Sequence, residues 1–199
     1  MSLRFVDEFE HGFGWVPAEE MLTRASHAVA VNGRVWVTDP VDGEGIDERI
    51  RALGEPAGVV QLLDRHARDS AAVAERLGAP LHVVPFDGVE GAPFEVRPIV
   101  RRKRWQEVAL WFPGERILVS ADALGSLSYF HGRSEPFGVH PFLRLFPPKR
   151  ALGGLEPSHL LFGHGEGYHG EDGGDALAEA LRTARRRLPH AFISFFRAG

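Results

Sequence analysis

The sequence of 199 residues contains no cysteine. This absence excludes disulfides, thiolate metal ligands and a cysteine nucleophile, and it fits a reducing compartment. The sequence also has no apolar run of the roughly 20 residues that a membrane-spanning helix needs. Its first residues, MSLRFVDEFEHGFGW, carry acidic side chains where a secretory signal has an apolar run. We therefore expect a cytoplasmic protein without a membrane partner.

The sequence lacks two further signals, a serine-nucleophile motif and an overall positive charge. It has no Gly-x-Ser-x-Gly elbow, so covalent serine catalysis has no support. The net charge is −4, which gives no general attraction to nucleic acid. The basic run RRKR (101–104) is typical of a solvated strand edge. Nucleic acid is therefore not an expected partner.

The composition is that of a folded protein. Apolar residues make up 44% of the chain and charged residues 25%, which is enough apolar surface for a substantial core. No low-complexity linker divides the chain. We predict a single domain over residues 1–199.

The first half of the chain predicts alternating strands and helices. HAVAVNGRVWVTDP (27–40) has the pattern of a hairpin that turns at Asn32-Gly33. Apolar spacing and capping residues then predict a helix over 45–53, a buried strand over 57–63, a helix that begins at Asp69 or Ser70, and a strand over 80–84. This order is typical of parallel crossover units.

The second half predicts a different arrangement. Strands are expected over 94–100, 107–112, 116–122 and 158–163, followed by a helix capped by Asp175 and a last strand or docked segment over 191–196. The turn PGER (113–116) makes two of these strands antiparallel. Residues 123–157 are rich in Phe, Pro and Gly and have no sustained period, which is typical of a lid, a binding loop or a partner surface.

Polar residues follow four of the predicted strands. They are Asp39, the run QLLDRHARDS (61–70), Asp122 and His164. Ligands of α/β sheets collect at the carboxyl ends of strands, so these residues are the candidate site.

Four segments together resemble the metallo-β-lactamase superfamily. They are VWVTDP, LLDRHARDSAAVAERLGAP, EVALWFPGERILVSADALGS and HLLFGHGE. The resemblance covers almost the whole chain and implies an α/β fold of the four-layer αββα sandwich type. It also implies metal ions held by His and Asp ligands, which suit zinc, iron or manganese.

The second segment departs from the family's His-x-His-x-Asp-His motif in either possible register. With Asp69 on the motif's Asp, Arg65 and Ala67 fall on the first two His positions. With a shift of one residue, His66 and Asp69 fall on His positions and Arg68 falls on the Asp. The family's next His is also missing, because RRKRWQ (101–106) contains none. A full dinuclear site is therefore not expected.

The residues that remain can hold at most one divalent metal ion. The candidate ligands are Asp122 and His164 with His66 or Asp69, and Asp39 is the candidate that orients a ligand. The same five residues are the candidate catalytic residues.

Two arginines offer an alternative to a metal ion. Arg65 or Arg68 can pair with Asp122 or Asp69 and replace the charge of the cation permanently. The leading hypothesis is therefore a degenerate metal site that is not an ordinary di-zinc hydrolase and whose cleft binds a small or anionic ligand through these arginines. One alternative is a hydrolase of esters, thioesters or phosphodiesters that uses a single metal ion. Another is a non-catalytic binding or assembly module that forms homo-oligomers through the Phe-rich segment 125–150.

Other histidines and a glycine motif have plainer interpretations. GEGYHG (165–170) matches a dinucleotide-binding pattern weakly, and a Gly-rich turn is the preferred interpretation. His159 and His169 are interpreted as a strand residue and a loop residue. His131 and His140 can reach the cleft if their loop folds over it.

Overall fold

The computed structural model describes residues 1–19, 24–130 and 135–189. The predicted last segment over 191–196 and His131 lie outside these ranges. No helix among the described residues is long and apolar enough to cross a membrane.

The first sheet holds the N-terminal part of the chain, with its strands in sequence order. Its strands are β1 (Leu3–Phe9), β2 (Gly12–Pro17), β3 (Ser26–Val31), β4 (Arg34–Thr38), β5 (Glu55–Gln61) and β6 (Leu81–Val83). Strands β1 to β4 are antiparallel. Helix α1 (Ile46–Leu53) and helix α2 (Ser70–Leu77) make the connections that leave β4, β5 and β6 parallel.

The second sheet has the order β13-β12-β9-β8-β7. Its strands are β7 (Glu95–Arg102), β8 (Trp105–Phe112), β9 (Ile117–Ser120), β12 (His159–Phe162) and β13 (Tyr168–His169). Strands β9 and β12 run parallel, whereas β7, β8 and β9 are antiparallel. Helix α3 (Lys149–Leu152) and helix α4 (Gly173–Thr183) also belong to this half.

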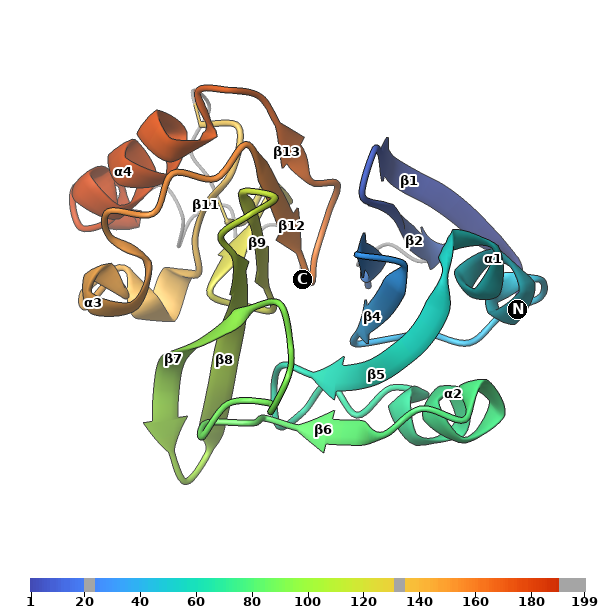
Figure 1. The fold of residues 1–199 in the computed structure, drawn as a ribbon. Coiled ribbons are helices and arrows are strands. Elements are labelled where there is room, and N and C mark those ends of the chain that lie inside the picture. The colour runs from blue at the N-terminus through green and yellow to red at the C-terminus, as the bar shows by residue number, and fades with distance from the viewer. Residues whose placement is uncertain (20–23, 131–134, 190–199) are drawn as a thin grey trace.

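The two sheets and four helices form four layers. In Figure 1, α3 and α4 flank the second sheet on the left, and α1 and α2 flank the first sheet on the right. One apolar cluster joins the facing sides of the sheets, with Trp36 and Leu62 meeting Leu110 and Phe112. A second cluster lies between the first sheet and its helices, and a third lies between the second sheet and its helices. The predicted αββα sandwich is confirmed.

Most of the predicted elements are present. The hairpin turns at Asn32 and Gly33, which have φ angles of 52° and 75°. Both residue types tolerate this left-handed backbone, so the sequence signal was reliable. Helix α2 ends at Gly78, which has a φ of 69°.

Other elements differ from the prediction, beginning with the start of α4 and the N-terminal strands. Asp175 lies inside the first turn of α4, and Asp172 is the residue before the helix. Strands β1 and β2 were not predicted, although Phe13 and Trp15 of β2 are buried in the core.

The segment 123–157 is not a single irregular loop. It contains β10 (Leu124–Gly125), β11 (Gly138–Val139), a 3₁₀ turn (Pro141–Leu143) and α3. Arg144 is fully buried and fixes this segment by donating hydrogen bonds to the carbonyl groups of Phe130 and Val139. A buried guanidinium needs several acceptors. A third, longer hydrogen bond, to the carbonyl group of Ala184 at 3.4 Å, links the segment to the end of α4.

Candidate metal centre

Four of the predicted site residues lie at one edge of the sandwich. Asp39 follows β4, His66 lies in the turn after β5, Asp122 follows β9 and His164 follows β12. Each of these strands runs parallel to a neighbour, so their carboxyl ends lie together. The edge predicted from the sequence is therefore the edge at which these side chains meet.

Asp122 is the centre of the group. Its Oδ1 lies 3.1 Å from Nε2 of His66 and 3.1 Å from Nε2 of His164. The three side chains each offer one ligand atom, and these atoms lie within 4.8 Å of one another. Among the described residues this is the group that could hold a metal ion. The side chains are 9%, 10% and 15% exposed for His66, Asp122 and His164, so the group is shielded but can be reached from solvent.

Two observations show that these residues fit a divalent ion. Oδ1 of Asp122 is buried and forms no hydrogen bond of acceptable geometry, despite the two nearby imidazoles. Nδ1 of His66 lies 2.9 Å from Oδ2 of Asp39, which is the arrangement that orients a metal-binding histidine and leaves Nε2 to the ion. Two imidazole nitrogens and one carboxylate oxygen are a donor set that suits zinc, iron or manganese.

Each charged side chain in the group shifts the pKa of its neighbours. Burial raises the pKa of Asp122, but the adjacent His164 and His66 outweigh it and hold the pKa well below the ordinary value. Burial lowers the pKa of His66, but Asp122 and Asp39 outweigh it and raise the pKa to about 9. In the absence of a metal ion, His66 is therefore protonated at neutral pH.

Arg65 occupies the other oxygen of Asp122. Its guanidinium donates to Oδ2 of Asp122 at 3.0 Å and lies 3.6 Å from Oδ1 of Asp64. The same guanidinium stacks on the ring of Trp105 at 4.7 Å. The two oxygens of Asp122 thus face different neighbours, the imidazoles on one side and an arginine on the other.

Arg68 has a structural position. It donates hydrogen bonds to the carbonyl groups of Ala25, Asp39 and Gly163 at 2.6, 2.8 and 3.1 Å. These carbonyl groups belong to both halves of the sandwich. Its backbone has a φ of 42°, in the left-handed region. Arg68 therefore ties the ends of the two sheets together beside the site.

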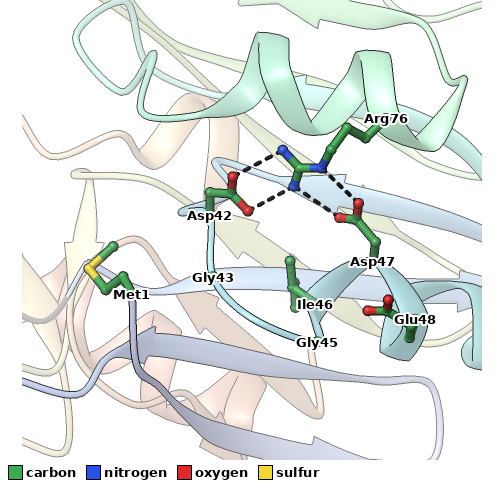
Figure 2. A pocket seen from close by; sticks show the side chains of 8 residues that line it. All are labelled: Met1, Asp42, Gly43, Gly45, Ile46, Asp47, Glu48 and Arg76. Atoms are coloured by element: carbon green, nitrogen blue, oxygen red, sulfur yellow. Dashed lines mark hydrogen bonds and ion pairs between the residues drawn. The ribbon is translucent and has the colours of Figure 1, made fainter.

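Asp69 lies outside the three-residue group. Its Oδ2 accepts a hydrogen bond from the backbone of Asp42 at 2.8 Å, and it is the residue before α2. Figure 2 shows that Arg76 of α2 donates hydrogen bonds to Asp42 and also to Asp47 at the start of α1. Asp69 therefore belongs with the contacts that hold the loop after β4 against α2.

Glu107 was missed by the sequence interpretation. It is fully buried in β8, where its two oxygens accept hydrogen bonds from the indole of Trp105 and the backbone of Ala123, each at 2.7 Å. Burial, assisted by the charge of Asp122, raises its pKa to about 8. An acidic residue within the apolar strand EVALWF was the signal for this role.

His140 contributes from the segment 123–157. It is buried with its ring centroid 5.1 Å from that of Trp105, and burial lowers its pKa to about 4. The expectation that this histidine reaches the cleft region fits this position.

His159 and His169 form a separate contact. Their Nδ1 atoms lie 2.8 Å apart, and His169 belongs to β13 instead of a loop. Asp7 lies beside His169 and accepts a hydrogen bond from the backbone of Gly167 at 2.7 Å. The glycine-rich turn is therefore attached to β1 of the other sheet.

Comparisons of the sequence alone give no relative. No family model matches the chain, and no curated protein matches it.

Comparisons of the structure give clear likenesses. The DIM-1 metallo-β-lactamase exposed to ceftazidime aligns with a TM-score of 0.60 at 15% identity, over 92% of this chain and 98% of that one. A metallo-β-lactamase from Pontibacter korlensis aligns with a TM-score of 0.57 at 10% identity, over 92% of this chain and 99% of that one. The rubredoxin oxygen:oxidoreductase of Desulfovibrio gigas aligns with a TM-score of 0.63 at 13% identity, over 94% of this chain and 62% of that one. With the layers and strand order described above, these likenesses show that the chain has the metallo-β-lactamase fold.

Proposed function

We propose that the protein is a metal-dependent hydrolase that uses one divalent ion, with Arg65 in the place of a second cation. The observation that carries the proposal is that the two carboxylate oxygens of Asp122 have different partners. Its Oδ1 faces His66 and His164, whereas its Oδ2 is taken by Arg65. A carboxylate in this arrangement can bind one ion and one guanidinium at the same time.

The donor set supports a catalytic type of site. His66, Asp122 and His164 would hold the ion, and three protein ligands leave a position open for water or substrate. A divalent ion in such a position supplies a nucleophile at neutral pH and polarises the group under attack. Ester, thioester and phosphodiester bonds are the substrate classes that this chemistry serves.

The remaining residues have roles around this site. Asp39 holds His66 by its Nδ1, so the imidazole keeps Nε2 directed at Asp122. Arg65 is half-exposed and always charged, so it can also pair with a negative group of the substrate. Both roles follow from side chains that are already in contact.

The second candidate function needs no metal ion. The Arg65–Asp122 pair and the raised pKa of His66 support a salt-bridged site that binds a small anion. The buried Oδ1 of Asp122, which lacks a hydrogen bond, favours the metal-binding form.

Zinc titration of paired variants tests the proposal. We expect the full chain to bind about one zinc ion by calorimetry and to hydrolyse at least one of the three substrate classes. His164→Ala should abolish both, whereas His159→Ala should leave both unchanged because His159 lies away from the group. Equal zinc binding by the two variants would overturn the proposal. If the unmodified chain bound no zinc, the proposal would also fail, and the anion-binding form would be favoured.

A further inference from the structure

A groove of about 640 Å³ lies beside the metal centre. One wall is the hairpin of β7 and β8, and the other is the segment around Phe142 and Phe146. This volume is within the range of small-molecule sites, which run from about 300 to 1,000 Å³. The groove is therefore large enough for an organic ligand.

The groove presents apolar side chains to solvent. Phe142, Leu145 and Phe146 are 60%, 53% and 78% exposed, and they account for most of the large exposed apolar side chains among the described residues. Phe142 and Phe146 line the groove together with Ile99 of β7. Large apolar groups gathered on one face mark an interaction site more often than scattered ones do.

The same groove is positively charged. Arg102 and Arg104 line it, and no carboxylate is present among the described residues that line it. Arg185 lies over the ring of Phe146 at 5.9 Å. The chain as a whole has a net charge of −4, so this positive surface is local. An occupant that matches the groove is both apolar and negatively charged.

Trp105 connects the groove to the metal centre. It lines the groove, its ring carries the guanidinium of Arg65, and Arg65 is bonded to Asp122. Its indole is fixed from behind by the hydrogen bond to Glu107. Trp105 and Arg65 are therefore the two side chains between a ligand in the groove and the carboxylate of Asp122.

We propose that this groove binds an amphipathic organic anion, with an acyl or aryl body against Phe142 and Phe146 and a negative group at Arg102 and Arg104. The inference rests on the proposed function, because it assigns the groove to the part of the substrate that does not react. The negative group can be a carboxylate, a sulfonate or a phosphate, since a guanidinium pairs with each of them.

Octyl phosphate is a suitable probe, and the full chain is used with excess chelator so that no metal ion contributes. We expect calorimetry to show octyl phosphate binding at least about tenfold more tightly than inorganic phosphate, which lacks the apolar chain, or octyl glucoside, which lacks the negative charge. Comparable binding of all three compounds, or no binding of octyl phosphate, would overturn the proposal.

Two pairs of variants localise the binding. Phe146→Ser and Arg104→Gln should each weaken octyl phosphate binding about fivefold or more. Val83→Ser and Lys103→Gln should not, because Val83 is an exposed residue of β6 and Lys103, in the same basic run, does not line the groove. Equal effects of Phe146→Ser and Val83→Ser, or of Arg104→Gln and Lys103→Gln, would contradict the assignment.

Two other occupants are separate outcomes. Sedimentation with vesicles of phosphatidylcholine and phosphatidylglycerol would overturn the proposal if the protein bound the vesicles through Phe146 but did not bind octyl phosphate. Analytical ultracentrifugation would overturn it if the protein were a dimer that dissociated on the Phe146→Ser substitution but not on addition of octyl phosphate. Because these measurements exclude metal ions, a failure here is distinguishable from a failure of the zinc titration.

Discussion

The indole nitrogen of Trp105 donates a hydrogen bond to Oε2 of Glu107 at a distance of 2.7 Å. The two residues are two positions apart in β8, so their side chains share one face of the strand. Trp105 lies under the guanidinium of Arg65, and Glu107 also holds the backbone of Ala123, next to Asp122. The buried carboxyl group of Glu107 thus positions both Trp105, which contacts Arg65, and Ala123, which follows Asp122.

Replacing Glu107 should reduce stability markedly. Glu107→Leu leaves the partly buried indole of Trp105 and the amide of Ala123 without an acceptor, and we expect a loss of about 2–4 kcal/mol in urea unfolding. Glu107→Gln keeps one acceptor oxygen and should lose about 1 kcal/mol. Equal losses in the two variants would show that the hydrogen bonds are not what the residue contributes.

Glu107 also gives a defined pH dependence. Its pKa is raised from 4.5 to about 8, so between these values the folded protein holds a proton that the unfolded chain has lost. The stability from this group is complete below about pH 4.5 and is lost as the pH rises towards 8. Glu107→Gln should flatten this part of the stability profile in urea titrations, and a profile of unchanged slope would contradict the assignment.

Zinc affinity should rise with pH. The ion needs Nε2 of His66 without its proton, and the pKa of His66 is about 9. Below pH 9, each increase of one pH unit should tighten zinc binding by about tenfold, because one proton is released from His66 for each ion bound. Competition with a chelator between pH 6 and 9 measures the slope. Asp39→Asn removes a carboxylate that raises the pKa of His66, so the slope should end at a lower pH.

In the metal-free protein, the folding stability contributed by His66 should fall as the pH rises. Because the folded pKa is raised above the ordinary 6.5, stability from its protonated form is complete below about pH 6.5 and is lost through pH 9. Urea unfolding in excess chelator measures this, with Asp39→Asn as the variant that should reduce it.

Removing the charge of Arg65 should separate activity from metal content. Arg65→Gln keeps a polar side chain beside Asp122 but loses the cation, so we expect one zinc ion per chain and about 10²-fold lower kcat/KM on an anionic substrate. Arg76→Gln is the matched control, because Arg76 pairs with Asp42 and Asp47 away from the centre (Figure 2). A similar fall in activity in both variants would contradict a specific role for Arg65.

The sequence was sufficient to predict the fold and the edge of the site. Alternating strands, the Asn32-Gly33 turn and the polar residues after each strand were local signals that the structure retains. Strands β1 and β2 gave a weaker signal, because the buried strand GFGWVP contains two glycines and a proline.

The choice between His66 and Asp69 depended on the backbone after β5. A turn in which the amide of His66 donates to the carbonyl of Leu63 directs this histidine at Asp122. Arg68 follows with a left-handed backbone and α2 begins at Ser70, which leaves Asp69 just before the helix with its carboxylate accepting from the amide of Asp42. Motif spacing alone does not contain these dihedral angles, so both registers were open.

Anomalous scattering from a zinc-soaked crystal tests the central claim most directly. The account predicts one peak, bounded by Nε2 of His66, Nε2 of His164 and Oδ1 of Asp122, with Arg65 still on Oδ2 of the same carboxylate. Two peaks, with Arg65 displaced, would show a dinuclear site. No peak at Asp122 would show that Arg65 and protonated His66 replace the metal ion.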